Sequence, residues 1–427
     1  MRLDSLAVNL GVQADTGYTF DRAFIDSRSA GPESLFFALP GSRTHGHDFV
    51  PDALALGAAA VVSRAGFQGP VLVVPNTTEA LFQAGSWARA HFSCPVAAIT
   101  GSSGKTTTRE LLMLALGAVM SVDGTRGNLN NRLGLPLSLI NASKDASALV
   151  LELGMNHSGE LLSLGAVAAP DLSVVTNIGT AHIEFFGSRD GIAHAKAELL
   201  RTTKPGGIAV IPATEPILRE AARERDLRVF TTGPGGDARV ENGVLMPWGL
   251  RPVLSVPGAH NLENALTATL AATLMGVDPE TAVKAMEGYV GMPGRGRVLH
   301  RGGFTVYDES YNANPDSTMA CLDLLAGSGE KGIAVLGDML ELGGLSAEAH
   351  RLVLERVLGM RLRLVVLVGA EFEKVWHGGN GVAWVPDAAS ALAMLTASVR
   401  DGDSVLVKGS HSLGLDSVVR GISGEGC

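Results

Sequence analysis

The stretch AAITGSSGKTTTREL, from Ala97 to Leu111, decides the fold of this chain. A short apolar run leads into a glycine turn, and a Lys-Thr pair then opens a segment with helical spacing. Gly101 and Gly104 allow backbone N–H groups to turn toward phosphate oxygens, and the helix start adds partial positive charge. Strand, loop and helix in this order predict a nucleotide-phosphate site in an α/β sheet.

The glycine spacing of this loop departs from the general form G-x-x-x-x-G-K-[ST]. Ile99 stands where the first glycine is expected, so the spacing is T-G-x-x-G-K-T. Lys105 is placed to reach the β- and γ-phosphates of ATP, and the Thr106 hydroxyl to bind Mg²⁺. The candidate phosphate-binding residues are Gly101, Ser102, Ser103, Gly104, Lys105, Thr106 and Thr107.

The composition narrows the class of protein. The chain has 427 residues, 46% hydrophobic and 18% charged, which suits several folded domains. A net charge of −9 disfavours a nucleic-acid partner. No apolar run is long enough for a membrane span, and the start lacks the apolar core of a signal peptide. Cys94, Cys321 and Cys427 are too few and scattered for a disulfide framework, which fits a reducing cytoplasm.

The order of apolar runs divides the chain into three segments. Residues 1–93 have short apolar runs between turns, and a helix is expected over Glu79–Phe92. Residues 94–293 alternate apolar strands with helices, which predicts a largely parallel, doubly covered sheet. A glycine-rich hinge at Gly291–Arg297 leads into a second α/β pattern over residues 294–427. No GxGxxG follows its strands, so a dinucleotide site has little support.

Several polar residues follow apolar strands, where an α/β sheet binds its ligands. Glu152 ends one strand and is a candidate Mg²⁺ ligand, or else a capping or salt-bridging acid. His182 follows another and is a candidate for a metal or phosphate, although a lone histidine is more often structural. Lys196 lies in a helical segment and, taken alone, suggests a solvated lysine.

Two asparagine-rich stretches give a less specific signal of ligand binding. The asparagines of GNLNN (Gly127–Asn131) suit recognition of polar groups, but such turns also occur for backbone reasons alone. Asn261 and Asn264 lie at a helix start, where Asn261 is also a plausible N-cap.

In YDESYNANPDS (Tyr307–Ser317) a third strand ends in a polar cluster, preceded by Arg295 and Arg297. An arginine near the γ-phosphate would neutralise developing charge.

In combination, the motifs resemble the Mur ligases, and the resemblance covers essentially the whole chain. The stretches that carry it are DSRSAGPESLFFALPGSRTHGHDF, TGSSGKTT, GNLNNRLGLPL, LELGMNHSGE, NIGTAHIEFFGS, PGAHNLENALTA, DESYNANPDS, LGDMLELG and VLVKGSHS. The resemblance implies three domains. Residues 1–93 would bind a UDP-sugar, residues 94–293 would bind ATP, and residues 294–427 would form a Rossmann-like domain for the incoming amine.

The resemblance also implies roles for individual residues. Thr106 and Glu152 would hold one Mg²⁺, and His182 with a carbamate on Lys196 a second. Lys105, Glu152, His182 and Lys196 would be the catalytic residues. The remaining ATP contacts would be Asn261, Asn264, Arg295, Asp308, Tyr311 and Asn312. The UDP-substrate contacts would be Ser27, Arg28, Phe36, Ala38, Arg43, His47, Asn128, Asn130 and Asn131.

The implied reaction is ATP-dependent amide formation in peptidoglycan synthesis, by a monomer in the bacterial cytoplasm. D-alanyl-D-alanine would be joined to UDP-N-acetylmuramoyl-tripeptide through an acyl phosphate. The alternatives are a sibling ligase that adds one amino acid, a folylpolyglutamate-type ligase, and a plain phosphotransferase. GNLNN and SYNANPDS argue against the first two.

Two positions depart from the family pattern. The common KGSR is here Lys408-Gly409-Ser410-His411, which puts the contact of that arginine in doubt. His194 stands where a second lysine is common, which leaves Lys196 as the carbamylation candidate in its segment.

Overall fold

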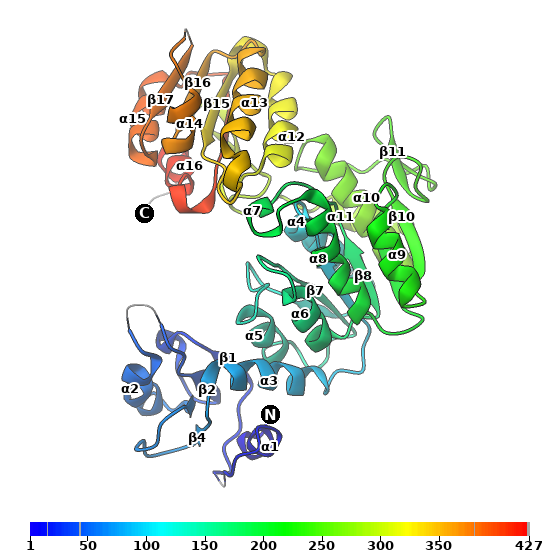
Figure 1. Cartoon of the computed structure of the whole chain (residues 1–427), viewed down its shortest axis with the longest axis vertical. Coiled ribbons are helices and arrows are strands. Elements are labelled where there is room, and N and C mark those ends of the chain that lie inside the picture. The colour runs from blue at the N-terminus through cyan, green and yellow to red at the C-terminus, as the bar shows by residue number, and fades with distance from the viewer. Residues whose placement is uncertain (15, 42–43, 380, 425–427) are drawn as a thin grey trace.

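The computed structural model describes residues 1–14, 16–41, 44–379 and 381–424. In these ranges the strands form three larger sheets and one small hairpin. Figure 1 shows the first sheet at the lower left, the second on the right and the third at the top. The three larger sheets lie within residues 22–73, 96–232 and 297–408, one in each segment expected from the sequence.

The first sheet has the order β1-β2-β3-β4, with every neighbouring pair parallel. Phe24 and Phe36 stack on one of its faces, with ring centroids 5.5 Å apart. The helix expected over Glu79–Phe92 begins earlier, because the Asn76 side chain accepts from the N–H groups of Thr78 and Glu79. The elements of this first segment are α1 (Leu3–Asn9), β1 (Arg22–Phe24), η1 (Ser27–Ser29), β2 (Ser34–Phe37), η2 (Gly46–Phe49), α2 (Val50–Ala55), β3 (Ala59–Val62), β4 (Val71–Val73) and α3 (Thr77–Arg89).

The second sheet has the order β10-β9-β8-β5-β7-β6 and is parallel throughout. Its strands are β5 (Val96–Thr100), β6 (Val122–Gly124), β7 (Ala148–Glu152), β8 (Leu172–Val175), β9 (Ile208–Pro212) and β10 (Arg228–Thr232), followed by the hairpin β11 (Arg239–Glu241) and β12 (Val244–Met246). Its helices are α4 (Lys105–Gly117), α5 (Gly134–Ile140), α6 (Glu160–Ala168), α7 (Ile183–Phe186), α8 (Arg189–Thr202), α9 (Pro216–Glu224), α10 (Ala259–Leu274) and α11 (Pro279–Met286).

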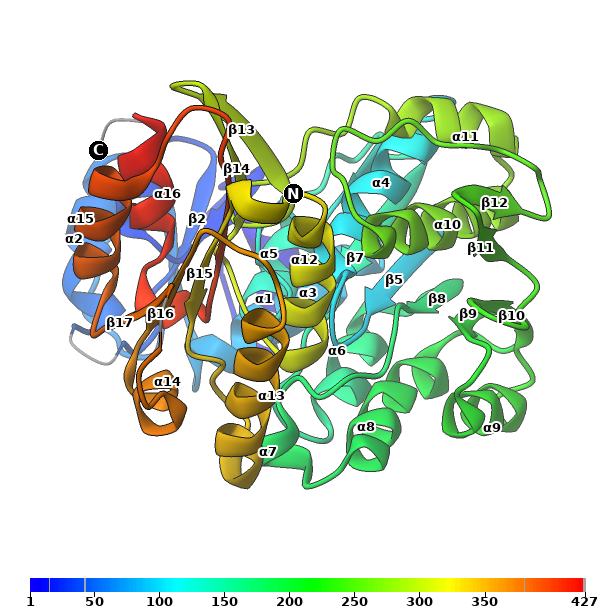
Figure 2. The ribbon, with the colours of Figure 1, turned by 90° about the horizontal axis from the view of Figure 1, so that it is seen from above.

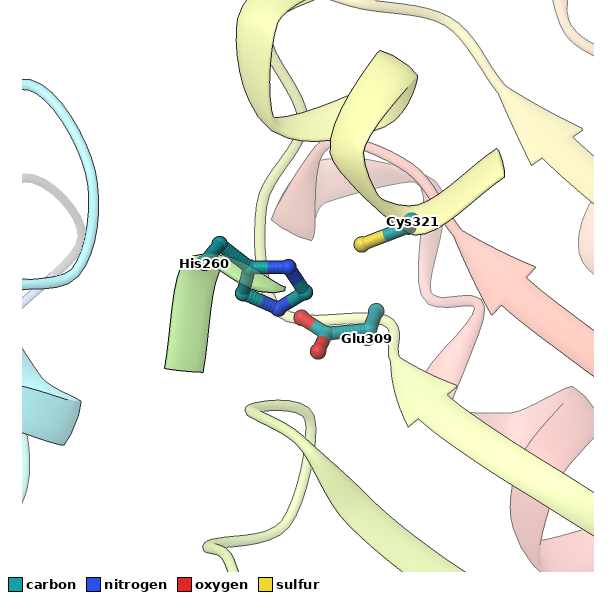
Figure 3. Close-up of side chains that lie close together, drawn as sticks. All are labelled: His260, Glu309 and Cys321. Atoms are coloured by element: carbon teal, nitrogen blue, oxygen red, sulfur yellow. The ribbon is translucent and has the colours of Figure 1, made fainter. Parts of the chain in front are cut away.

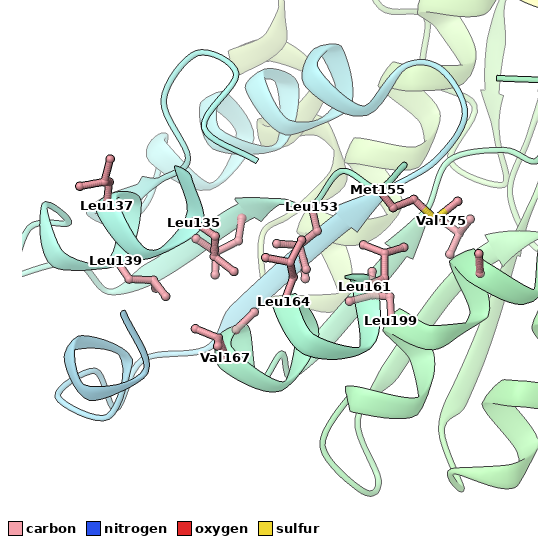
Figure 4. Close-up of a cluster of buried hydrophobic side chains, with 14 of the residues drawn as sticks. Leu135, Leu137, Leu139, Leu153, Met155, Leu161, Leu164, Val167, Val175 and Leu199 are labelled. Atoms are coloured by element: carbon pink, nitrogen blue, oxygen red, sulfur yellow. The ribbon is translucent and has the colours of Figure 1, made fainter. Parts of the chain in front are cut away.

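Helices cover both faces of this second sheet, as the apolar strands predict. Helices α4, α10 and α11 pack on one face, and α6, α8 and α9 lie on the other (Figure 2). Figure 4 shows the leucine-rich core beneath α5, α6 and α8, which includes Leu135, Leu161 and Leu199. Full burial of one such side chain stabilises the fold by roughly 1.5–3 kcal/mol. This core holds the strand ends, and therefore the loops that follow them, in fixed positions.

The third sheet has the order β13-β14-β18-β15-β16-β17, parallel except for the antiparallel edge strand β13. Its strands are β13 (Arg297–Arg301), β14 (Phe304–Glu309), β15 (Gly332–Gly337), β16 (Leu364–Val368), β17 (Val382–Val385) and β18 (Ser404–Lys408). Its helices are α12 (Pro315–Ala326), η3 (Gly329–Lys331), η4 (Gly343–Leu345), α13 (Ser346–Leu358), α14 (Ala370–Val375), α15 (Ala388–Ser398), η5 (His411–Leu413) and α16 (Asp416–Ser423). The expected α/β class is confirmed.

None of the helices in the described ranges has the length and apolar character needed to cross a bilayer.

Candidate active site

The phosphate loop connects β5 to α4. Gly101 and Gly104 have φ of +156° and +75°, values that L side chains rarely adopt. Gly104 precedes α4 without any side-chain cap. The N–H groups of the first helical turn are therefore left for a ligand, as in other anion sites at helix starts. The Lys105 ammonium donates to the Gly101 carbonyl at 2.8 Å, which folds this side chain over the loop.

Gly104 also permits a close contact with α10. A Cβ at this position would lie 2.2 Å from Oδ1 of Asn264. We expect Gly104→Ala to destabilise the native state by about 1–3 kcal/mol and to weaken ATP binding, because both the backbone and Asn264 must shift. Thermal unfolding and ATP titration measure the two effects. Gly117→Ala is the matched control on α4, since a Cβ there meets open space. Equal behaviour of the two variants would contradict the expectation.

Glu152 lies at the end of β7 and is fully buried. Its carboxylate accepts from Arg109 Nη1 at 3.1 Å and from Asn130 Nδ2 at 2.7 Å. Burial lowers the pKa of Lys105 to about 8, opposed by the charge of Glu152 and assisted by that of Arg295. The charges of Glu152 and Arg295 therefore both act on Lys105, although Arg295 lies in the glycine-rich hinge.

The loop after β8 carries His182. Its Nδ1 lies 2.5 Å from a carboxylate oxygen of Glu341, which belongs to the LGDMLELG stretch. Hydrogen bonding to His182 lowers the pKa of Glu341, so the ionised carboxylate is the acceptor. The ring is thereby oriented by a residue from the third segment.

Lys196 lies in α8 with 1% of its surface exposed, which rules out a solvated lysine. Burial, assisted by the charge of Lys105, lowers its pKa well below the usual value. Within the part of the chain that the structure describes, its ammonium group takes part in no hydrogen bond or ion pair. A neutral amine is the form in which a buried, unpaired lysine is stable.

A cavity of about 590 Å³ lies between the phosphate loop, the start of α10 and the end of β14. It brings together ten of the predicted ATP contacts: Ser102, Ser103, Gly104, Lys105, Thr107, Asn261, Asn264, Arg295, Tyr311 and Asn312. Gly101, Thr106 and Asp308 do not line it. Asp308 is instead buried, where it accepts from the Gly294 N–H at 2.8 Å and from the Ser310 hydroxyl at 2.7 Å. Asp308 thus holds the hinge through Gly294, and its predicted contact with ATP stays a prediction.

The cavity wall contains residues that the sequence did not single out as ligand contacts. His260, Glu309 and Cys321 come from α10, β14 and α12, and their potential ligand atoms lie within 4.8 Å of one another (Figure 3). Burial lowers the pKa of His260 to about 4 and raises the pKa of Cys321 to about 12. Burial also raises the pKa of Glu309. This set of N, O and S atoms suits Zn²⁺ better than Mg²⁺. Burial thus favours the neutral forms of all three side chains in the cavity wall.

Aromatic stacking accounts for the departure at position 411. The Arg295 guanidinium carbon lies 3.8 Å from the centroid of the Tyr311 ring, and His411 stacks on that ring at 5.0 Å. His411 thus supports Tyr311, and through it the arginine at the cavity.

Comparison with known proteins agrees with this geometry. Family models match the chain in three places: the Mur ligase middle domain at residues 99–272, the Mur ligase glutamate ligase domain at 294–411, and the Mur ligase family catalytic domain at 22–81. The UDP-N-acetylmuramoyl-tripeptide–D-alanyl-D-alanine ligase of Synechocystis sp. is 35% identical over 416 residues, which span 94% of this chain and 91% of that protein.

The chain belongs to the Mur ligase family. It is accordingly an ATP-dependent ligase. A crystal structure of MurF from Acinetobacter baumannii superimposes with a TM-score of 0.90 at 32% identity, covering 99% of both chains. The MurF ligase from Thermotoga maritima, solved in complex with ADP, gives a TM-score of 0.83 at 29% identity over 95% of this chain and 97% of that one.

The described residues among those expected to bind the UDP-substrate do not line the cavity at the phosphate loop. Ser27 and Arg28 are on η1, and Arg28 pairs with Asp26 at 2.5 Å. The side chains of Phe36 and Ala38 lie in the core of the first sheet, and their predicted contact with the UDP-substrate stays a prediction. His47 is buried and accepts from the Ser63 N–H at 2.8 Å. Arg43 lies outside the described residues.

The three asparagines of the GNLNN turn have different surroundings. Asn130 holds Glu152, and Asn131 accepts from the N–H groups of Leu133 and Gly134 at the start of α5. Asn128 is exposed. The structure thus gives Asn130 and Asn131 local hydrogen-bonding roles, while Asn128 and Asn131 are both exposed to solvent.

Proposed function

We propose that this Mur ligase joins D-alanyl-D-alanine to UDP-N-acetylmuramoyl-tripeptide, the reaction named in its Synechocystis relative. The observation that carries the proposal is the cavity in which the phosphate loop faces Arg295 from the third segment. The UDP-linked carboxylate, which accepts the phosphoryl group, and the amine, bound on opposite sides of this cavity, would meet at the γ-phosphate. Residues 1–93 would bind the UDP-sugar, 94–293 ATP and 294–427 the amine. The use of ATP places the reaction in the cytoplasm.

ATP would lie with its phosphates against the loop and its adenine near Asn261 and Asn264. Lys105 and Arg295 would approach the γ-phosphate from opposite sides and neutralise the charge that develops there. Arg295 is held for this task by stacking on Tyr311.

The residues present fit one Mg²⁺ beside the loop. The Thr106 hydroxyl oxygen is buried without a hydrogen-bond partner among the described residues, and an oxygen ligand of this kind is what Mg²⁺ requires. Glu152 supplies a buried carboxylate at the adjacent strand end. When bound, Mg²⁺ would offset the negative charge of the phosphates.

The second predicted site consists of His182 and Lys196. A carbamate forms when a neutral lysine amine attacks CO₂ and loses a proton, and the lowered pKa of Lys196 favours that amine. The product is a bidentate oxygen ligand for a hard cation. His182, with Nδ1 engaged by Glu341, has Nε2 left for a metal.

The chain's own residues position two successive displacements. A carboxylate oxygen of the UDP-linked peptide attacks the γ-phosphorus, and the bond to the ADP oxygen breaks. The amine nitrogen of the dipeptide then attacks the acyl carbon, phosphate leaves and the nitrogen loses a proton. Phosphorylation is needed because a carboxylate otherwise has oxide as its leaving group. Enclosure between the segments keeps water from the acyl phosphate.

The test is phosphate release with each amine supplied separately. We expect release from ATP only when UDP-N-acetylmuramoyl-tripeptide and D-alanyl-D-alanine are both present. L-lysine, diaminopimelate and glutamate serve as competing amines. Release with a free amino acid but not the dipeptide would indicate a sibling ligase. A phosphorylated product that accumulates with no amine required would indicate a phosphotransferase.

A further inference from the structure

The loop that carries His182 is held by the third segment at several points. Asp316, in the first turn of α12, accepts from the Thr180 N–H at 2.9 Å and from its hydroxyl at 3.0 Å. The Glu184 N–H donates to the Glu341 carbonyl at 3.2 Å. A carboxylate oxygen of Glu341 lies 2.5 Å from Nδ1 of His182. Contacts from two elements of the third segment therefore fix the loop on both sides of the histidine.

The backbone at this contact is unusual on both sides. His182 and Glu341 each have φ of +62°, in the left-handed region that favours glycine. Such conformations persist where the surrounding structure holds them, and they occur often at functional sites. Here the carboxylate–imidazole contact joins the two residues directly, and the backbone hydrogen bond from Glu184 to Glu341 lies beside it. Gly343, at the start of η4, packs its backbone against Glu184; a Cβ there would lie 3.2 Å from the Glu184 Cβ.

The contact between the Glu341 carboxylate and Nδ1 also decides which ring nitrogen of His182 is free for a metal. A carboxylate accepts from Nδ1–H, so the neutral ring keeps its lone pair on Nε2. Histidines that bind metals commonly donate their other N–H to a carboxylate, which fixes the tautomer and increases the basicity of the ligand. In this chain that carboxylate comes from a different segment from the histidine.

We propose that Glu341 is the positioning residue for His182, so that the second metal site is complete only when the third segment is docked. The proposal rests on the function proposed above, which assigns His182 to that site. It gives the LGDMLELG stretch a role, because docking of the amine-binding segment then assembles the metal site. Metal binding and segment closure would be coupled reciprocally.

Manganese binding tests this proposal without turnover. Mn²⁺ titration of the full chain with a non-hydrolysable ATP analogue, followed by electron paramagnetic resonance, separates two sites. We expect Glu341→Ala to weaken the second site by about 10- to 100-fold and to leave the first unchanged. Glu341→Gln retains an oxygen that accepts from Nδ1–H, so the loss of Mn²⁺ affinity at the second site should be smaller. Glu348→Gln, at an exposed position on α13, is the matched control.

The histidine tautomer provides a second measurement. With ¹⁵N-histidine labelling, the His182 signals, assigned from a His182→Ala variant, should show Nδ1–H in the native chain and lose that preference in Glu341→Ala. Unchanged Mn²⁺ affinity and tautomer in a folded Glu341→Ala variant would overturn the proposal. If the native chain ligates the dipeptide but binds one Mn²⁺, the positioning role is wrong and the proposed function stands. If it fails to ligate, the proposed function is wrong.

Discussion

Lys196→Ala should lower kcat by about 100- to 1,000-fold, the range seen when one preorganised electrostatic contact is removed from a phosphoryl-transfer site. The side chain is buried with a depressed pKa, and its charge would oppose that of Lys105 if it were protonated. The proposed carbamate would replace an unfavourable cation with an anion that can serve as a metal ligand. Alanine removes the amine on which the carbamate forms. The rate of phosphate release with both substrates measures the loss.

Three controls distinguish a carbamate from a structural lysine. Added bicarbonate should not restore Lys196→Ala, because the amine itself is missing. The native chain equilibrated with ¹³C-bicarbonate should show a carbamate carbon signal that is absent from the variant. Lys204→Ala, at an exposed lysine paired with Asp171 in the loop after α8, should retain full activity. Undiminished activity in Lys196→Ala would remove the carbamate from the mechanism.

The central strands could be predicted closely because their sequence signal is local. β5 (Val96–Thr100) is the apolar run expected before the glycine turn, and its five residues are all buried. β13 was missed, because Arg297–Arg301 is a polar edge strand whose pairing depends on the turn at Gly302 and Gly303. β6 and β10, at the two edges of the second sheet, were also missed.

The site residues divide in the same way. The phosphate loop is a continuous motif, and most of its residues line the cavity. Glu341 and Arg109 were missed because their partners, His182 and Glu152, are distant in the sequence. Lys196 looked solvated because its burial depends on tertiary packing. Phe36 and Ala38 lie in an apolar run, and their side chains are buried in the core of the first sheet, as an apolar run predicts.

Arg109 should have a large effect on stability. It is fully buried in α4, where it donates to the Gly127 carbonyl at 2.8 Å, to Glu152 at 3.1 Å and also to Glu110. Arg109→Met leaves the Glu152 carboxylate buried with Asn130 as its remaining side-chain donor. Breaking a buried ion pair from one side costs about 3–5 kcal/mol, because the remaining charge is uncompensated. Urea unfolding, followed by a probe in the central segment, measures the change.

A double variant tests this cause. Arg109→Met with Glu152→Gln removes both charges and should recover part of the stability, since no buried charge is then left unpaired. Arg126→Met is the surface control: its arginine side chain is 73% exposed beside Asp123, so the change should stay within about 0.5 kcal/mol. If Glu152 also binds Mg²⁺, that ion should stabilise Arg109→Met more than the native chain, because it supplies the missing positive charge. Equal stabilisation of the two would argue that Glu152 serves Arg109 alone.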